Sequence, residues 1–153
     1  MTIDDRLRDR GLVLPEPAAP LASYVPFVRA GDLLHVSGQI SRDASGGVWR
    51  GTLGGDLSIE EGARAAESCA LQLLSQVRAA CGGDWDRLLR VVKLTGFVAS
   101  APGFVDQPKV VNGASDLFVA LLDEAGRHAR SAIGVSALPL GAAVEVEGVF
   151  LLR

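Results

Sequence analysis

Two stretches of the chain carry apolar residues at helical spacing. The first follows Ser58 and ends at Gly82-Gly83. Ser58 stands three residues before Glu61, an arrangement in which a hydroxyl and a carboxylate each satisfy a free backbone N–H group at a helix start. The second stretch covers residues 106–126. The pattern therefore predicts two long helices, each with one apolar face.

Shorter apolar or alternating runs predict strands between and around these helices. They cover residues 24–29, 33–39, 48–53, 88–98, 130–137 and 143–152. Because several of these strands follow one another with no helix between them, the order favours an α+β fold over a doubly wound parallel fold. We expect a single mixed sheet of about six strands with the two helices packed on one face.

The N-terminal segment precedes this pattern without forming a domain of its own. Residues 3–10 predict a short helix that ends at Gly11. Pro15, Pro17 and Pro20 then predict an extended arm with few hydrogen bonds. We therefore expect one domain over residues 1–153, in which residues 1–20 form a helix and a proline-rich arm.

The composition agrees with one globular domain. The chain has 153 residues, of which 48% are apolar, and a domain of this size buries enough surface to need no disulfide framework. Its two cysteines, Cys69 and Cys81, lie twelve positions apart in the first predicted helix. That separation along one helix is too large for them to bridge each other.

The charge pattern argues against several kinds of partner. Fifteen Lys and Arg residues stand against eighteen Asp and Glu residues, which gives a formal net charge of −3 with no long run of one sign. No basic patch indicates nucleic acid or an anionic membrane surface. No segment predicts a signal peptide or a membrane span, so the sequence predicts a cytoplasmic protein.

Most catalytic motifs are missing from the sequence. The two histidines, His35 and His128, and the two cysteines do not form a metal-ligand pattern. The chain has no glycine-rich nucleotide-binding motif and no Gly-x-Ser-x-Gly nucleophile elbow. We therefore expect chemistry without a metal or a cofactor.

One constellation remains, on the last two predicted strands. Period two places Arg130 and Ala132 on one face of the first strand, and Glu145 and Glu147 on one face of the second. An Arg fork beside small residues can hold a carboxylate ligand, and a nearby Glu can activate a water molecule. The alternative is a cross-strand ion pair between Arg130 and one of the two glutamates, an arrangement that is common and contributes little stability.

The chain also carries a set of short motifs in a characteristic order. They are Ser37-Gly38-Gln39-Ile40, Lys93-Leu94-Thr95-Gly96-Phe97, Ala129-Arg130-Ser131, Leu138-Pro139 and Val144-Glu145-Val146-Glu147. None of them is specific alone, but the set in this order is. From Tyr24 to the C-terminus, the chain resembles the YjgF/RidA family of reactive intermediate deaminases, also labelled L-PSP endoribonuclease-like.

This resemblance implies a fold, an assembly and an activity. Members of the family are homotrimers with a chorismate-mutase-like α+β fold, and their pockets lie between protomers. They hydrolyse reactive enamine and imine acids such as 2-aminoacrylate to 2-oxo acids and ammonia, without a cofactor. The expected ligand is therefore a small carboxylate.

The resemblance also implies roles for particular residues. It places the carboxylate-binding arginine at Arg130 and the water-positioning glutamate at Glu145, which would be the catalytic residues. The expected substrate-binding positions are Tyr24, Ser37, Gly38, Asn112, His128 and Ala132. For Tyr24, packing at the trimer seam is the alternative role, and for His128 the alternative is a hydrogen bond to the backbone at the pocket rim.

Three positions depart from the family pattern and indicate a divergent subgroup. His128 replaces the usual proline, Ala132 occupies a position often held by cysteine, and Gly134 stands where many deaminases have an acidic residue. These departures leave two functions open, a hydrolase of imino and enamine acids and a non-catalytic trimer that binds a metabolite carboxylate or acts in regulation. Ribonuclease activity is disfavoured, because an acidic chain without basic stripes lacks a field that attracts phosphate.

Overall fold

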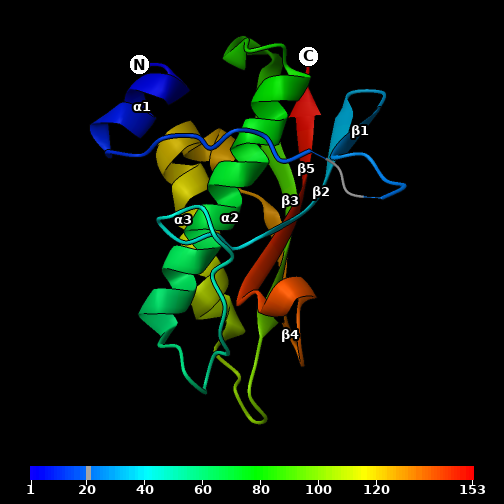
Figure 1. The fold of residues 1–153 in the computed structure, drawn as a ribbon. Coiled ribbons are helices and arrows are strands. Elements are labelled where there is room, and N and C mark those ends of the chain that lie inside the picture. The colour runs from blue at the N-terminus through cyan, green and yellow to red at the C-terminus, as the bar shows by residue number, and fades with distance from the viewer. Residues whose placement is uncertain (20–21) are drawn as a thin grey trace.

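A five-stranded sheet forms one layer of the molecule, and the helices form the other (Figure 1). The structure is a computed structural model that describes residues 1–19 and 22–153. The strands are β1 (Phe27–Ala30), β2 (Leu33–Ile40), β3 (Leu88–Ala99), β4 (Ala129–Val135) and β5 (Val144–Leu152). They lie in the order β1-β2-β5-β3-β4. Only the pair of β3 and β4 is parallel in this sheet, so the predicted mixed α+β sheet is confirmed with five strands instead of six.

The strand expected over residues 48–53 is the one that does not form. Trp49 N–H donates to Ser41 O, whereas Leu53 N–H donates to Ala99 O, so the segment bonds in turn to the ends of different strands. Gly51 has a φ of 139° and is packed under the side chain of Leu57. A continuous ladder needs one partner strand, and this segment has only isolated bridges across the end of the sheet.

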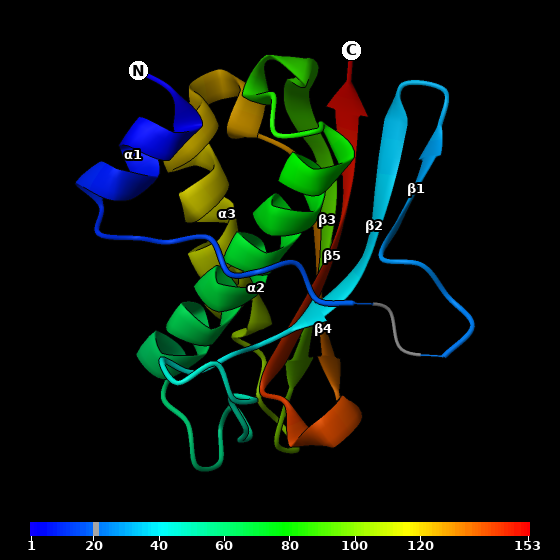
Figure 2. The ribbon, with the colours of Figure 1, turned by 45° about the horizontal axis from the view of Figure 1, so that its top comes forward.

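Two long helices cover one face of the sheet, as Figures 1 and 2 show. Helix α2 (Ile59–Ala80) begins with the predicted capping box, in which Glu61 N–H donates to Ser58 Oγ at 3.1 Å and Ser58 N–H donates to Glu61 Oε2 at 2.8 Å. Helix α3 (Gln107–Leu122) continues into a short 3-10 turn over Asp123–Gly126. None of the helices in the described ranges is long and apolar enough to cross a membrane.

The core lies between this helical layer and the sheet. Its largest fully buried side chains include Phe118 of α3 and Phe150 of β5, whose ring centroids lie 5.8 Å apart. The two helices approach each other closely, because Gly113 of α3 lies directly against the carbonyl group of Ala63 on α2. No Cβ fits at that point, so the position of α3 depends on glycine there.

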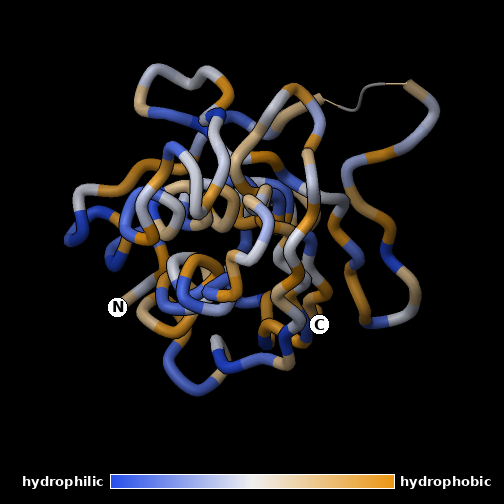
Figure 3. The backbone as a smooth tube through the Cα atoms, turned by 90° about the horizontal axis from the view of Figure 1, so that it is seen from below, coloured by the Kyte–Doolittle hydropathy of each residue, from blue (hydrophilic) through white to orange (hydrophobic). Residues whose placement is uncertain are grey.

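No helix of the described residues lies on the opposite face of the sheet (Figure 2). The β1–β2 hairpin carries both hydrophobic and hydrophilic residues along its strands (Figure 3). Val28 is 54% exposed and Ile133 is 43% exposed on this face. Polar residues such as His35 and Lys93 lie between these apolar ones, so the uncovered face is amphipathic.

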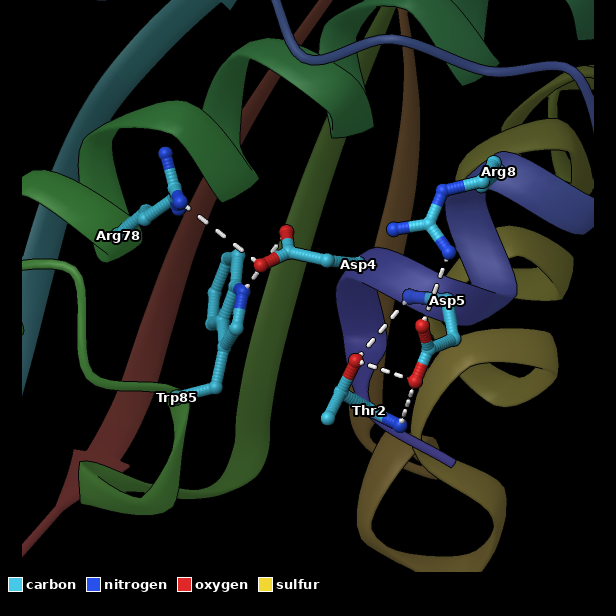
Figure 4. A network of polar contacts seen from close by, with 6 residues as sticks. All are labelled: Thr2, Asp4, Asp5, Arg8, Arg78 and Trp85. Atoms are coloured by element: carbon cyan, nitrogen blue, oxygen red, sulfur yellow. Dashed lines mark hydrogen bonds and ion pairs between the residues drawn. The ribbon is translucent and has the colours of Figure 1, made fainter.

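The N-terminal helix α1 (Ile3–Asp9) is attached to both long helices, and it spans nearly the predicted residues. Figure 4 shows Asp4, whose Oδ1 accepts a hydrogen bond from Trp85 Nε1 at 3.0 Å and whose Oδ2 lies 3.7 Å from Arg78 of α2. On the side of α3, Arg6 pairs with Asp123 at 2.6 Å. These contacts hold α1 against the end of the helical layer.

The expected proline-rich arm runs from α1 across α2 (Figure 2). Two buried side chains of α2 bind its backbone: Ser75 Oγ donates to Pro15 O at 2.7 Å, and Gln76 Nε2 donates to Ala18 O at 3.0 Å. Pro20, the last proline assigned to the arm, lies outside the described residues. The arm is thus extended, as expected, but is held by side chains of α2.

Gly113→Ala tests the close contact between the two long helices. An alanine normally favours a helix over glycine by about 0.5–1 kcal/mol. Here its Cβ would overlap the carbonyl of Ala63, and we expect a net loss of about 1–3 kcal/mol in the free energy of unfolding, measured by urea denaturation. Asp116→Ala, an exposed position on the same helix, is the control and should change stability by less than about 0.5 kcal/mol. A stabilised Gly113→Ala variant would contradict the contact.

Candidate functional site

Arg130 on β4 is held against α3. Its Nη1 donates to Asn112 Oδ1 at 2.8 Å and to Ser115 Oγ at 3.1 Å, and its Nη2 donates to Pro108 O at 3.4 Å. These three partners follow one another at helical spacing and therefore lie on one side of α3. The structure thus brings together Arg130 and Asn112, two residues that the sequence assigned to one site.

His128 lies in the same cluster. Its Nδ1 lies 2.6 Å from Gly126 O and its Nε2 lies 2.9 Å from Ser115 Oγ. Burial lowers the pKa of the imidazole below its usual value, and the charge of Arg130 acts in the same direction, against the Gly126 hydrogen bond that raises it. The backbone contact is the alternative role that the sequence left open for His128.

Glu145 on β5 lies in a different part of the molecule. It is half-buried in a cavity of about 370 Å³ whose lining includes Tyr24, Gly38 and Leu140. A Cβ at position 38 would overlap the Glu145 carboxylate, so Gly38 is required for this placement of the side chain. Glu145, Tyr24 and Gly38 therefore form a second cluster of predicted site residues.

Burial and a neighbouring charge both act on the carboxyl group of Glu145. Burial raises the pKa of the carboxyl above its usual value, and the negative charge of Glu147 raises it further. The sequence offered a cross-strand ion pair between Arg130 and one of these glutamates as the alternative to a ligand site. Within one chain, the described residues form no such ion pair.

The two clusters lie on opposite faces of the sheet. In the register of β3 with β4, Arg130 is opposite Leu94, which is fully buried under the helices. In the register of β3 with β5, Glu145 is opposite Phe97, three residues further along β3 and on the other face. Because β3 separates β4 from β5 and alternate residues point to opposite faces, one chain cannot bring Arg130 and Glu145 onto one small ligand.

Of the remaining predicted positions, Ala132 lies on the side of Arg130, whereas Ser37 lies apart from both clusters. Ala132 follows Arg130 on the helix-facing side of β4 and packs against the core. The Ser37 hydroxyl on β2 donates a hydrogen bond to Val25 O at 2.9 Å. Ser37 also lines a separate hollow of about 340 Å³ on the uncovered face of the sheet. Gly134 is one of the three positions that depart from the family pattern. A Cβ there would come within 2.6 Å of Gln107 Nε2, so the Gln107 amide occupies the space next to Gly134.

The sequence reasoning assigned no role to Ser115, although it belongs to the Arg130 cluster. The signal that could have found it is helical spacing, since it lies one turn beyond Asn112 on α3. In residues 1–19 and 22–153, no group of three or more His, Cys, Asp or Glu residues has a geometry that could hold a metal ion. Both cysteines are buried, and burial raises the pKa of the Cys69 thiol, so neither presents a reactive thiolate.

Comparison with known proteins identifies the family. The family model described as "YjgF/chorismate_mutase-like, putative endoribonuclease" matches residues 4–150. The chain belongs to the YjgF/RidA family. The match includes both clusters and the N-terminal helix from Asp4 onward.

Three relatives show how similar the chain is to other proteins in sequence and in structure. Protein TCP17 of Trypanosoma cruzi is 51% identical over 148 residues, which are 96% of this chain and 92% of that protein. The structure of Atu1372 from Agrobacterium tumefaciens is 44% identical with a TM-score of 0.92, covering 99% of this chain and 92% of the other. RidA from an Antarctic Psychrobacter is 26% identical with a TM-score of 0.55, covering 90% and 94%. The YjgF/chorismate-mutase-like fold expected from the sequence is thus confirmed.

The lowered pKa of His128 can be measured directly in this YjgF/RidA protein, because the chain has only two histidines. We expect an NMR pH titration to give His128 a pKa below 6.5, with its signal identified by its loss in His128→Gln. The unfolded chain then binds the proton more tightly, so the contribution of His128 to stability is present above pH 6.5 and is lost as the pH falls through the folded pKa. A pKa at or above 6.5 would contradict the effect of burial on the half-buried ring.

Proposed function

We propose that the protein is a homotrimer that hydrolyses the C=N bond of small 2-imino and enamine carboxylates, without a cofactor, at sites shared between protomers. The observation that carries this proposal is the division of Arg130 and Glu145 between opposite faces of one sheet. A neighbouring copy that covers the amphipathic face can bring its own Arg130 to the Glu145 cavity. Membership of the YjgF/RidA family supports this arrangement.

The Arg130 cluster has the chemistry of a carboxylate site. A guanidinium has five N–H donors, and the contacts to Asn112, Ser115 and Pro108 use three of them. Nε–H and one Nη2 hydrogen remain for a ligand. Two such donors on one planar group fit the two oxygens of a carboxylate.

The Glu145 cluster has the chemistry of a proton carrier. The Glu145 carboxylate accepts a proton from water as the oxygen bonds to the imine carbon, and the C=N bond becomes a single bond. Glu145 passes that proton to the nitrogen, which gives an intermediate with a hydroxyl and an amino group on one carbon. The hydroxyl proton then moves through Glu145 to the nitrogen, the C–N bond breaks, and ammonia leaves as the carbon becomes the carbonyl of a 2-oxo acid. The raised pKa fits this role, because a general acid–base group works best when its pKa lies closer to the operating pH.

A second candidate function has its own support. Ala132 offers no side-chain group that could polarise a nitrogen, and the Gln107 amide lies beside Gly134, where the family resemblance implies an acidic residue in many deaminases. A trimer that binds a metabolite carboxylate on Arg130 without turnover, or acts in regulation, needs neither group. Turnover assays separate the two functions.

The decisive assay generates 2-aminoacrylate and longer 2-imino acids in situ and measures the release of 2-oxo acid. We expect turnover by the wild type and loss of turnover in Arg130→Ala. Arg130→Lys should be impaired nearly as much, because an ammonium group cannot reproduce the planar fork. Glu145→Gln should lower kcat by about 100-fold with little change in ligand affinity, while Glu147→Gln, two residues along the same face, should change much less.

Equal rates for the wild type, Arg130→Ala and a blank without protein would instead favour the non-catalytic trimer. Full turnover in Glu145→Gln would remove the proposed mechanism while leaving a role for Arg130. Binding of 2-oxobutyrate, followed by calorimetry, then shows whether Arg130 still holds a carboxylate.

Mixed trimers test whether the site is shared between chains. Co-expressed Arg130→Ala and Glu145→Gln chains should recover activity, because an intact Glu145 from the first can meet an intact Arg130 from the second. Equal, random mixing restores about a quarter of the sites. The control pairs Arg130→Ala with the double variant Arg130→Ala/Glu145→Gln, which can form no complete site and should stay inactive.

Light scattering on the wild type should give the mass of a trimer at micromolar concentration. A monomeric mass, or a mixture of the two single variants no more active than the control mixture, would contradict a site shared between protomers.

A further inference from the structure

A hydrogen-bond chain leads from a backbone carbonyl to the guanidinium of Arg130. Gly126 O lies 2.6 Å from His128 Nδ1, His128 Nε2 lies 2.9 Å from Ser115 Oγ, and Ser115 Oγ lies 3.1 Å from Arg130 Nη1. All three distances are those of hydrogen bonds. This series of hydrogen bonds connects the turn after α3, helix α3 itself and strand β4.

The chemistry of the partners sets the direction of each proton. The Gly126 carbonyl can only accept, so His128 Nδ1 carries a hydrogen. In the neutral ring Nε2 is then an acceptor, and the Ser115 hydroxyl donates its single proton to it. The lone pairs of Ser115 Oγ are thereby left for Arg130, whose guanidinium can only donate.

The histidine ring in this chain is held from two sides. Its Nδ1 is bound to Gly126 O, and the ring of Phe118 meets it edge-on, with centroids 6.2 Å apart and an interplanar angle of 78°. Phe118 is itself fully buried. The acceptor that orients Ser115 is therefore attached to the core and does not move freely.

We propose that Ser115 and His128 are positioning residues, which fix the Arg130 guanidinium so that Nε–H and one Nη2 hydrogen are presented to the ligand carboxylate. The proposal rests on the proposed function, in which Arg130 binds that carboxylate. An arginine side chain has many rotamers, and binding must otherwise select one of them. Two oxygens on α3, from Asn112 and Ser115, hold Nη1 in place before the ligand arrives.

The role of His128 is indirect, since its contact is with Ser115 and not with Arg130. Without an acceptor at the position of Nε2, the Ser115 proton is free to turn toward other acceptors, and its lone pairs are no longer directed at Nη1. The effect of changing His128 should therefore be smaller than that of removing the Ser115 hydroxyl. It should also depend on whether the new side chain offers an acceptor at that distance.

The test measures the dissociation constant of 2-oxobutyrate by calorimetry. We expect Ser115→Ala to weaken binding by about 5- to 20-fold, less than most hydrogen bonds to a charged group contribute, because Asn112 still holds Nη1. Ser115→Thr keeps the hydroxyl and should stay within about threefold of the wild type. Asp116→Ala, next to Ser115 but exposed, is the control that should change nothing.

Two substitutions of His128 separate the acceptor from simple packing. His128→Gln carries an amide oxygen that reaches the position of Nε2, so it should bind nearly as tightly as the wild type. His128→Asn keeps a donor for Gly126 O but is too short to reach Ser115, and it should bind several-fold more weakly. In turnover assays the weaker variants should raise KM with little change in kcat, because Arg130 holds the carboxylate in the ground state and the transition state alike.

Thermal unfolding of every variant is followed in parallel. If Ser115→Ala does not fold, the His128 pair carries the test. Unchanged affinity in Ser115→Ala and His128→Asn, together with lost affinity in Arg130→Ala, would overturn this inference and leave the proposed function standing. No binding by the wild type, or unchanged binding in Arg130→Ala, would overturn both.

Discussion

The alternation of side chains across the pleated sheet is the constraint on which the site depends. Arg130 shares a face with Leu94 under the helices, and Glu145 shares the other face with Phe97. A slip of one residue in either register would turn every side chain of that strand to the opposite face and bring an apolar residue out of the core. Core packing therefore fixes the separation of the two charged groups, and chemistry that needs both requires a second chain.

Small residues place α3 where Arg130 can reach it. Gly113 lies against the backbone of Ala63, and Gly96 of β3 lies beneath Val111, so the helix packs closely on both α2 and the sheet. The side of α3 that carries Asn112 and Ser115 is then turned toward the edge strand β4. Packing at glycine and hydrogen bonding to Arg130 are thus two consequences of one helix position.

The Glu145 cluster illustrates a conflict between stability and chemistry. A half-buried carboxyl beside a second glutamate disfavours its own ionised form, and Gly38 provides the space in which it is held. Such arrangements contribute little to folding and are typical of functional sites, where perturbed carboxyl groups exchange protons. On the other side of the sheet, the half-buried ring of His128, whose pKa is lowered, supports the guanidinium of Arg130 through Ser115.

Local signals in the sequence determined most of the secondary structure. The capping pair of Ser58 and Glu61 and the glycines after α2 act within a few residues, so they can be interpreted without knowledge of the fold. Only the tertiary structure decided that residues 48–53 bond to several strand ends, that Ser115 joins Arg130, and that Arg130 and Glu145 face apart. These outcomes depend on pairing between segments far apart in the chain, and that pairing is set by how the whole core packs.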